Sequence, residues 1–267
     1  MIIRENPCIL CGQTNIPFSL YVGLLPRQDG EQLADESAYA SAVGSLGYAS
    51  NGTRPDISFA TSQLGSSNSL PTVRHWNAVC RVLRYLKGTP NLCLTYYFGS
   101  KSQYSTTKEQ ATIFSDSDFA SDISNRRSVS GYVVMLGGGP VCWQSRRQKS
   151  ISTSTAEAEY VALFEASKQA LWITRLINEF KVADKLIGKD GILTFTDNQS
   201  AMAIANGTSS AKTKHIDIAY HFVQDCVEKK IINLKYIPTN EMLADILTKP
   251  LSRAKAEPLR QELLRLY

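Results

Sequence analysis

Two kinds of hydrophobic pattern divide the chain at a polar stretch. Before this stretch, apolar residues recur every three or four positions in two segments, which predicts amphipathic helices. The residues that carry this spacing are Tyr39, Val43 and Leu46 in the first segment and, after Pro71, Trp76, Val79, Leu83 and Leu86 in the second. Pro55 suits the first turn of a further helix between them. The polar stretch itself, GSKSQYSTTKEQ, is rich in Ser and Thr and predicts a linker.

Beyond the linker, strands and helices alternate. Three consecutive strands are predicted in ATIFSDSDF, SGYVVML and PVCWQS, and GGG joins the last two as a hairpin. A long helix, STAEAEYVALFEASKQALWITRLINEF, is followed by the strand LTFT and a short helix. The helix HIDIAYHFVQDCVEKK, the strand IINLKYI and a short helix in NEMLADILTK, which must end before Pro250, complete the order. This order predicts a mixed sheet with helices on both faces.

Composition and charge limit the class of protein only loosely. The chain has 267 residues, of which 43% are hydrophobic, so it can bury a sizeable core. No apolar run has the length of a membrane-spanning helix, and the N-terminal stretch makes a poor signal peptide, so we expect a soluble, intracellular protein. The net charge of +5 permits a nucleic-acid partner without requiring one.

The six cysteines are scattered along the chain. Cys8 and Cys11 form a C-x-x-C, but no second pair of Cys or His residues completes a zinc site. We therefore expect ordinary thiols, and reduced cysteines fit an intracellular compartment.

Acidic side chains occur in pairs on two predicted elements. Asp116 and Asp118 lie two apart on the first strand, so they point to one face of it. Glu157 and Glu159 are also two apart, but on a helix this spacing separates them by about 200°. Ser154 and Glu157 have capping-box spacing, which gives Glu157 a structural role. Glu159 has no such role and borders the apolar stripe that must face the sheet, so it needs a partner or a metal.

Two further acids, Asp197 and Asp245, have positions that are unusual for a solvated acid. Asp197 follows a strand and precedes a short helix, so it is either the N-cap of that helix or a group at the sheet edge. Asp245 lies on a mostly apolar short helix. If the first strand and the strand before Asp197 are parallel neighbours, Asp116 and Asp197 meet at their carboxyl ends, where open α/β sheets place ligands. Glu159 and Asp245 can then reach the same place. Four such carboxylates repel one another unless hard divalent cations lie between them, and two such ions clamp the oxygens of a phosphodiester displacement. We therefore favour the ligand interpretation of Asp197 over the cap.

Several long motifs in one order resemble a known family. The stretches FSDSDFASDISNRRSVSGYVVMLGGGPVCWQSRRQKSISTSTAEAEYVAL, FTDNQSAMAIA, TKHIDIAYHFVQD and LADILTKPL resemble the ribonuclease H domain of copia-type LTR retrotransposon Pol polyproteins. The stretch VGSLGYASNGTRPDISFATSQLGSSNSLPTVRHWNAVCRVLRYLKGTPNL resembles the preceding thumb and connection end of the reverse transcriptase. The resemblance covers roughly residues 35–252. It implies an α/β fold, a ribonuclease H-like mixed five-stranded sheet flanked by helices and preceded by a small helical thumb-like domain.

The resemblance also implies an activity, the cleavage of the RNA strand of RNA–DNA hybrids with two Mg²⁺ ions, or with Mn²⁺ in their place. Matched position by position, Asp116, Glu159, Asp197 and Asp245 are the implied catalytic residues and metal ligands. Asp118 is the runner-up for the first of these positions. Cellular ribonucleases H carry a histidine shortly before the last aspartate, whereas KYIPTNEMLAD has none. The polymerase core, with its paired catalytic aspartates, is also missing from the sequence, so we expect no DNA synthesis.

Basic and polar side chains supply candidate contacts to the sugar–phosphate backbone. In the ribonuclease H-like part these are Arg126, Arg127, Arg146, Arg147, Lys149, Lys212 and Lys214, with Asn198 and Gln199 as candidates for a contact to a backbone or a 2′-hydroxyl. In the helical part, Arg81, Arg84 and Lys87 form a row three residues apart. This row is either a helix surface that lies along a phosphate backbone or a solvated face, which is the more common case.

The expected organisation has five parts. They are an irregular lead-in at 1–34, a helical reverse transcriptase thumb or connection remnant at 35–98, a linker at 99–110, the ribonuclease H domain at 111–252 and a C-terminal helical tail at 253–267. The expected partners are an RNA–DNA hybrid and the polymerase portion of the same polyprotein, with no membrane, and the implied location is a cytoplasmic virus-like particle or the nucleus. The alternative function is a non-catalytic retrotransposon-derived fragment that binds nucleic acid or protein. A transposase or integrase is disfavoured because such enzymes use an Asp–Asp–Glu order.

Overall fold

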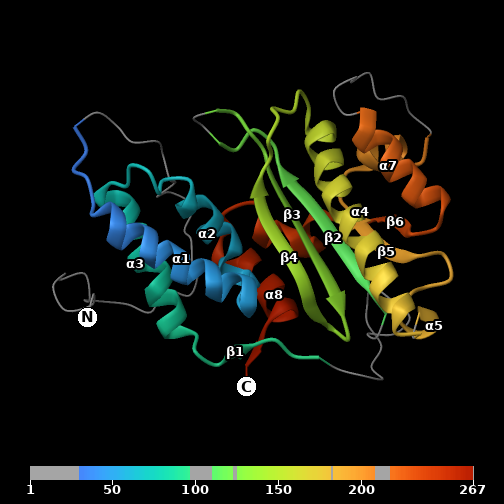
Figure 1. The fold of residues 1–267 in the computed structure, drawn as a ribbon, viewed down its shortest axis with the longest axis horizontal. Helices are drawn as coiled ribbons and strands as arrows, with labels where there is room; N and C mark the ends of the chain where they lie inside the picture. The colour runs from blue at the N-terminus through green and yellow to red at the C-terminus, as the bar shows by residue number, and fades with distance from the viewer. Residues whose placement is uncertain (1–29, 97–109, 123–124, 182, 208–216, 267) are drawn as a thin grey trace.

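A mixed sheet of five strands forms the centre of the protein (Figure 1). The computed structural model describes residues 30–96, 110–122, 125–181, 183–207 and 217–266. The strands, in spatial order, are β4 (Gly139–Arg147), β3 (Val129–Leu136), β2 (Thr112–Asp118), β5 (Ile192–Thr196) and β6 (Ile232–Tyr236). Strands β2, β3 and β4 pair antiparallel, while β5 and β6 run parallel to β2. This order and these directions confirm the predicted ribonuclease H-like sheet.

One face of the sheet is covered by the long helix α4 (Thr155–Glu179), together with α6 (Gln199–Ala205) and α7 (Asp217–Glu228) (Figure 1). A short helix, α5 (Ala183–Leu186), follows α4. The sequence favours α4 because its first half is rich in Ala, Glu and Leu, which lose little freedom in a helix. Tyr160 and Leu163 of α4 are fully buried against Ile113 and Val134 of the sheet in one hydrophobic core. Burial of this stripe on the sheet brings the start of α4 over β2.

The opposite face is covered by the 3₁₀ segment η4 (Leu243–Leu247) and the last helix, α8 (Arg253–Leu263), which share a core with Phe114 of the sheet. The 3₁₀ turn η3 (Thr239–Glu241), just before η4, buries no residue. The short helix predicted in NEMLADILTK is present as two short 3₁₀ turns, and the second ends before Pro250 as expected. Pro238 precedes the first turn, and Met242 between the turns is extended, with φ −71° and ψ 103°, so no continuous α-helix can form.

The part before the sheet forms a small helical bundle with its own core. Its elements are α1 (Glu36–Gly52), the 3₁₀ turn η1 (Pro55–Ile57), α2 (Ser58–Gly65) and α3 (Val73–Gly88). The predicted stripe of α1 is buried, but the stripe of α3 is wrong in part, because Leu83 is 43% exposed and Val82 and Tyr85 are buried instead. The Tyr85 hydroxyl donates a hydrogen bond to Asp56, which also pairs with Arg54 at 2.8 Å. This polar anchor turns Tyr85 toward the core and Leu83 toward solvent.

The helical bundle packs on the sheet beside β4. The indole Nε1 of Trp143 on β4 donates to the backbone oxygen of Ser50 at 3.0 Å, and the bundle lies on the β4 side of the sheet in Figure 1. A two-stranded sheet of β1 (Leu92–Cys93) and β7 (Arg265–Leu266) joins the end of the bundle to the last residues. The predicted linker falls mostly on residues 97–109, and Cys8 and Cys11 on residues 1–29, all outside the described residues. Within the described ranges, each helix is too short or too polar to cross a membrane.

Candidate functional site

The sheet opens at one end because the pairing of β2 with β5 stops early. The last pair of this parallel ladder is Phe114 with Phe195, whose stacked rings have centroids 4.9 Å apart. Strand β2 continues to Asp118, but there it is paired with β3. Asp116 therefore lies beyond the point of separation, and Asp197 directly follows the end of β5. The two acids stand at the carboxyl ends of adjacent parallel strands, as the sequence predicts.

Three carboxylates meet at this opening. Asp116, Glu159 and Asp197 each offer an oxygen, and these oxygens all lie within 4.8 Å of one another. Asp116 and Glu159 are 1% and 4% exposed, whereas Asp197 is half-buried. Glu159 reaches the site from the first turns of α4, and its Oε2 is buried and accepts no hydrogen bond from any residue that the structure describes. Such a set of close, buried oxygen donors fits a hard divalent cation such as Mg²⁺.

Asp245 joins the site from η4, and a lysine links it to Asp116. The Lys249 Nζ lies 2.8 Å from Asp245 Oδ1 and 3.5 Å from Asp116 Oδ2. The structure thus brings all four predicted acids to one place, three within direct reach of one another and Asp245 through Lys249. Sequence reasoning missed Lys249, although its spacing of four residues from Asp245 is a signal of an ion pair on one turn.

A threonine that follows η4 holds Asp116, and a glycine allows it to do so. The hydroxyl of Thr248, just after η4, donates a hydrogen bond to Asp116 Oδ2. Gly131 is the β3 partner of Asp116 in the ladder. A Cβ on Gly131 would lie 2.7 Å from Thr248 Cγ2 and 2.8 Å from Leu247 Cβ. Glycine at this position therefore permits η4 to approach the sheet closely enough to contact Asp116.

A second threonine holds Asp197. Thr239 Oγ1 donates to Asp197 Oδ2 at 2.7 Å. Thr239 belongs to η3, which lies in the stretch KYIPTNEMLAD. This is the stretch that lacks the histidine of cellular ribonucleases H. The side chain of Asn198, not that of Asp197, caps α6, since Asn198 Oδ1 accepts from the Ala201 N–H at 2.9 Å. Asp197 is consequently free of the capping role that was the alternative explanation for it.

Burial controls the protonation of the site. It raises the pKa of Glu159 well above its ordinary value and, with repulsion from Asp116, raises the pKa of Asp245 to about 7. Burial also raises the pKa of Asp116, against the opposing effects of Lys249 and Thr248. For Lys249, burial lowers the pKa, but the carboxylates of Asp116 and Asp245 outweigh it and raise the pKa above its usual range. Where no cation compensates them, these acids therefore release their protons at a higher pH than free carboxyl groups do.

The neighbouring acids of each pair have other surroundings. Asp118, at the end of β2, is half-buried and contributes no oxygen to the three-carboxylate cluster among the described residues. Glu157 Oε2 accepts from both the N–H and the hydroxyl of Thr153, each at 2.7 Å, and the Ser154 Oγ accepts from the Glu157 N–H at 3.2 Å. The structural role predicted for Glu157 is confirmed, with Thr153 rather than Ser154 receiving the returning side chain.

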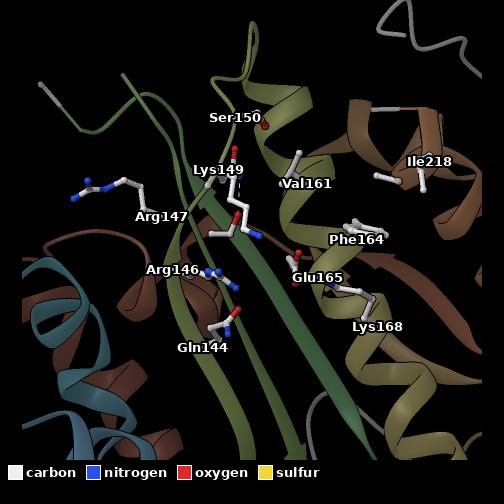
Figure 2. A pocket seen from close by; sticks show the side chains of 13 residues that line it. Gln144, Arg146, Arg147, Lys149, Ser150, Val161, Phe164, Glu165, Lys168 and Ile218 are labelled. Atoms are coloured by element: carbon white, nitrogen blue, oxygen red, sulfur yellow. Dashed lines mark hydrogen bonds and ion pairs between the residues drawn. The ribbon is translucent and has the colours of Figure 1, made fainter. Parts of the chain in front are cut away.

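A basic cavity lies between β4 and α4. It has a volume of about 360 Å³, and its basic lining residues include Arg146, Lys149 and Lys168. Figure 2 shows Arg146 and Lys149 on the α4 side of β4, whereas the side chain of Arg147 extends away from α4. Arg147 pairs instead with Asp122, with 2.9 Å between Arg147 Nε and Asp122 Oδ2. Lys168 was missed by sequence reasoning, because it lies within the long helix and carries no motif.

The other predicted nucleic-acid contacts are scattered. Arg126 and Arg127 are exposed between β2 and β3, and Gln199 is exposed at the start of α6. In the row on α3, Lys87 is exposed, while Arg81 and Arg84 are half-buried. Lys212 and Lys214 lie outside the described residues.

Curated proteins include relatives that match most of the chain. The retrovirus-related Pol polyprotein from transposon TNT 1-94 of Nicotiana tabacum is 39% identical over 220 residues, which are 82% of this chain and 16% of that polyprotein. The chain is a homologue of one segment of retrotransposon Pol polyproteins. The Pol polyprotein from transposon RE2 of Arabidopsis thaliana is 36% identical to this Pol homologue over 230 residues, 86% of the chain and 15% of that polyprotein. The Pol homologue thus spans about a sixth of the length of these relatives.

Solved structures similar to this Pol homologue include ribonucleases H. The crystal structure of LC11-RNase H1 in complex with an RNA/DNA hybrid aligns with 52% of this chain and 94% of that chain, at 16% identity and a TM-score of 0.39. No family model matches the chain.

Proposed function

We propose that this Pol homologue is a ribonuclease H, which hydrolyses the RNA strand of RNA–DNA hybrids with divalent metal ions. The observation that carries the proposal is the meeting of Asp116, Glu159 and Asp197, with oxygens within 4.8 Å of one another. The kinship with retrotransposon Pol polyproteins supports the same activity.

The four acids would hold the metal. Asp116, Glu159 and Asp197 supply the converging oxygens, and Asp245 extends the donor set on the η4 side. When bound, divalent ions such as Mg²⁺ supply an activated water and stabilise the charge on the phosphate. Thr248 and Thr239 hold Asp116 and Asp197 in position through their hydroxyl groups. Such hydrogen bonds to ligating carboxylates fix their orientation before the ion arrives.

The basic cavity would hold the hybrid. Arg146 on β4 and Lys149 in the following loop provide positive charge on one side of the sheet, whereas Lys168 on α4 is paired with Glu165 at 2.6 Å. Phosphate contacts of this kind position a duplex without reading its sequence. Gln199, exposed two residues after Asp197, is the candidate for a contact to the 2′-hydroxyl that distinguishes RNA from DNA. The polymerase portion of the same polyprotein is the proposed further partner.

A cleavage assay tests the proposal. A hybrid labelled on its RNA strand should be cut in Mg²⁺ and stay intact in EDTA, and single-stranded RNA and duplex DNA should be spared. Glu159→Gln should abolish the product, whereas the matched control Glu157→Gln should keep it, because Glu157 caps α4 rather than facing the cluster. Binding of the hybrid without any metal-dependent product would favour the alternative, a non-catalytic fragment.

A further inference from the structure

The ammonium of Lys249 lies between two of the four acids. Its Nζ is 2.8 Å from Asp245 Oδ1 and 3.5 Å from Asp116 Oδ2, and the side chains of these acids are 4% and 1% exposed. Lys249 itself is 27% exposed, so its stem reaches inward from the surface. A positive charge that belongs to the chain therefore already neutralises the η4 side of the site.

The site is divided at Asp116 into two unequal halves. On one side, Asp116 meets Glu159 and Asp197, and Glu159 Oε2 accepts no hydrogen bond among the described residues. On the other side, Asp116 and Asp245 share the Lys249 ammonium. A divalent ion bridging Asp116 and Asp245 would need the same space, because Mg²⁺ binds oxygens at about 2.1 Å. Two cations cannot occupy that space together.

The local chain geometry keeps Lys249 in this position. Lys249 follows Asp245 by four residues, and its N–H donates to the Asp245 backbone oxygen at 3.2 Å. Thr248, the residue before it, is itself fixed by its hydrogen bond to Asp116. Lys249 is thus anchored through its backbone, its neighbour and its side chain.

We propose that Lys249 is a positioning residue that acts as a built-in cation at the second metal position, so that the metal-free site is ready for one divalent ion and admits another only when the lysine side chain withdraws. The inference rests on the proposed metal-dependent function. In this scheme the first divalent ion binds on the side of Glu159 and Asp197. The second divalent ion must compete with the Lys249 ammonium for the position between Asp116 and Asp245.

Ion binding by the whole chain, without substrate, tests this role. Calorimetric titration with Mn²⁺ should give one tight ion per chain for the wild type and two for Lys249→Met, with the second bound at least about tenfold more tightly than in the wild type. Without metal, Lys249→Met should melt at a lower temperature, because the acids lose their counter-charge. The matched control is Lys229→Met, which removes an exposed ion pair of the same spacing and the same 2.8 Å distance to Asp225.

Three outcomes of these experiments test the role of Lys249. Equal Mn²⁺ stoichiometry and affinity in the wild type and Lys249→Met would overturn the inference. Lys249→Arg keeps the charge and should keep the wild-type stoichiometry, so a second tight ion in this variant would also overturn it, even if Lys249→Met does not fold. The expected stoichiometries in a chain that does not cut hybrid would support the role of Lys249 while removing the proposed cleavage.

Discussion

Asp116 is the residue on which the contacts of the site converge. It shares the carboxylate cluster with Glu159 and Asp197, accepts the hydroxyl of Thr248 and faces the ammonium of Lys249. Glu159 contacts Asp116 from the α4 face of the sheet, and Thr248 and Lys249 contact it from the η4 face. A residue on β2 can contact groups from both faces only where β2 has separated from β5. The position of Asp116 along the strand therefore matters as much as its charge.

Substitution of the paired acids should separate their roles. Asp116→Asn should lower hybrid cleavage by about a thousandfold or more, since loss of a ligand removes several kcal/mol of transition-state stabilisation. Asp118→Asn should retain most of the activity, because Asp118 lies outside the cluster. Single-turnover rates in Mg²⁺ measure both. An inactive Asp118→Asn beside an active Asp116→Asn would place the site two residues further along β2.

The raised pKa values predict how stability depends on pH. The pKa of Asp245 is raised from 3.8 to about 7, chiefly by burial. Protonation then favours the folded state, so this contribution is complete below the ordinary pKa and is lost as the pH rises through about 7. In EDTA the protein should melt at a higher temperature at about pH 5.5 than at about pH 8, and Mg²⁺ should stabilise it more at the higher pH because it must displace protons.

Thermal melting of Asp245→Asn provides the control for this pH dependence. The variant should melt at temperatures that differ less between the two pH values. A metal-free wild type that melts higher at alkaline pH would contradict the direction of these pKa shifts.

At the level of elements, the sequence predicts the strands and helices from the regular spacing of their apolar residues. It does not predict contacts that depend on how closely two elements approach each other. The strands of the sheet, the helix α4 and the carboxyl-end position of Asp116 and Asp197 follow from periodicity and order. The roles of Thr248, Thr239 and Lys249 do not, because they depend on how near η4 and η3 come to the sheet. The approach of η4 is permitted by the missing side chain of Gly131, which no local pattern records.

Gly131→Ala should test this approach. The added Cβ would meet Thr248 and Leu247 at less than normal contact distance, so η4 must move away from β3. We expect a loss of about 1–3 kcal/mol in the free energy of unfolding, as for other overpacked sites, together with weaker Mg²⁺ binding. Urea denaturation and Mg²⁺ titration measure the two effects.

A second glycine provides the control for this substitution. Gly44 in α1 has open space where a Cβ would lie, so Gly44→Ala should stabilise the helix by roughly 0.5–1 kcal/mol. A neutral or stabilising Gly131→Ala would show that η4 does not depend on the close contact.

For the whole molecule, the question is which surface a bound RNA–DNA hybrid would follow. The carboxylates open at the end of the sheet, the basic cavity lies between β4 and α4, and the helical bundle packs beside β4. The sequence names the basic residues but cannot assign them to a surface. Arg146 and Arg147, adjacent in sequence, have different neighbours in the structure, because successive residues of a strand point to opposite faces.

Salt dependence should identify the surface. The double substitution Arg146→Ala and Lys149→Ala should weaken hybrid binding and reduce the slope of log affinity against log salt by about one for each lost phosphate contact. Lys255→Ala, on the exposed side of α8, should leave the slope unchanged. Fluorescence anisotropy at several salt concentrations in EDTA measures binding without cleavage. If replacing Arg81, Arg84 and Lys87 reduces the slope instead, the hybrid follows α3.

The early end of the ladder between β2 and β5 also divides the backbone amides of the site into two classes. Up to Phe114, both edges of β2 are engaged by neighbouring strands, but from Ser115 to Asp118 the ladder continues only with β3. Backbone groups on the edge that faced β5 must there be satisfied by side chains such as Glu159, which accepts from the Ser117 backbone, by water, or by whatever occupies the opening. Deuterium exchange at these few amides would therefore report occupancy of the site directly. Amides around Phe114 and Phe195 would exchange slowly in every state and serve as an internal reference.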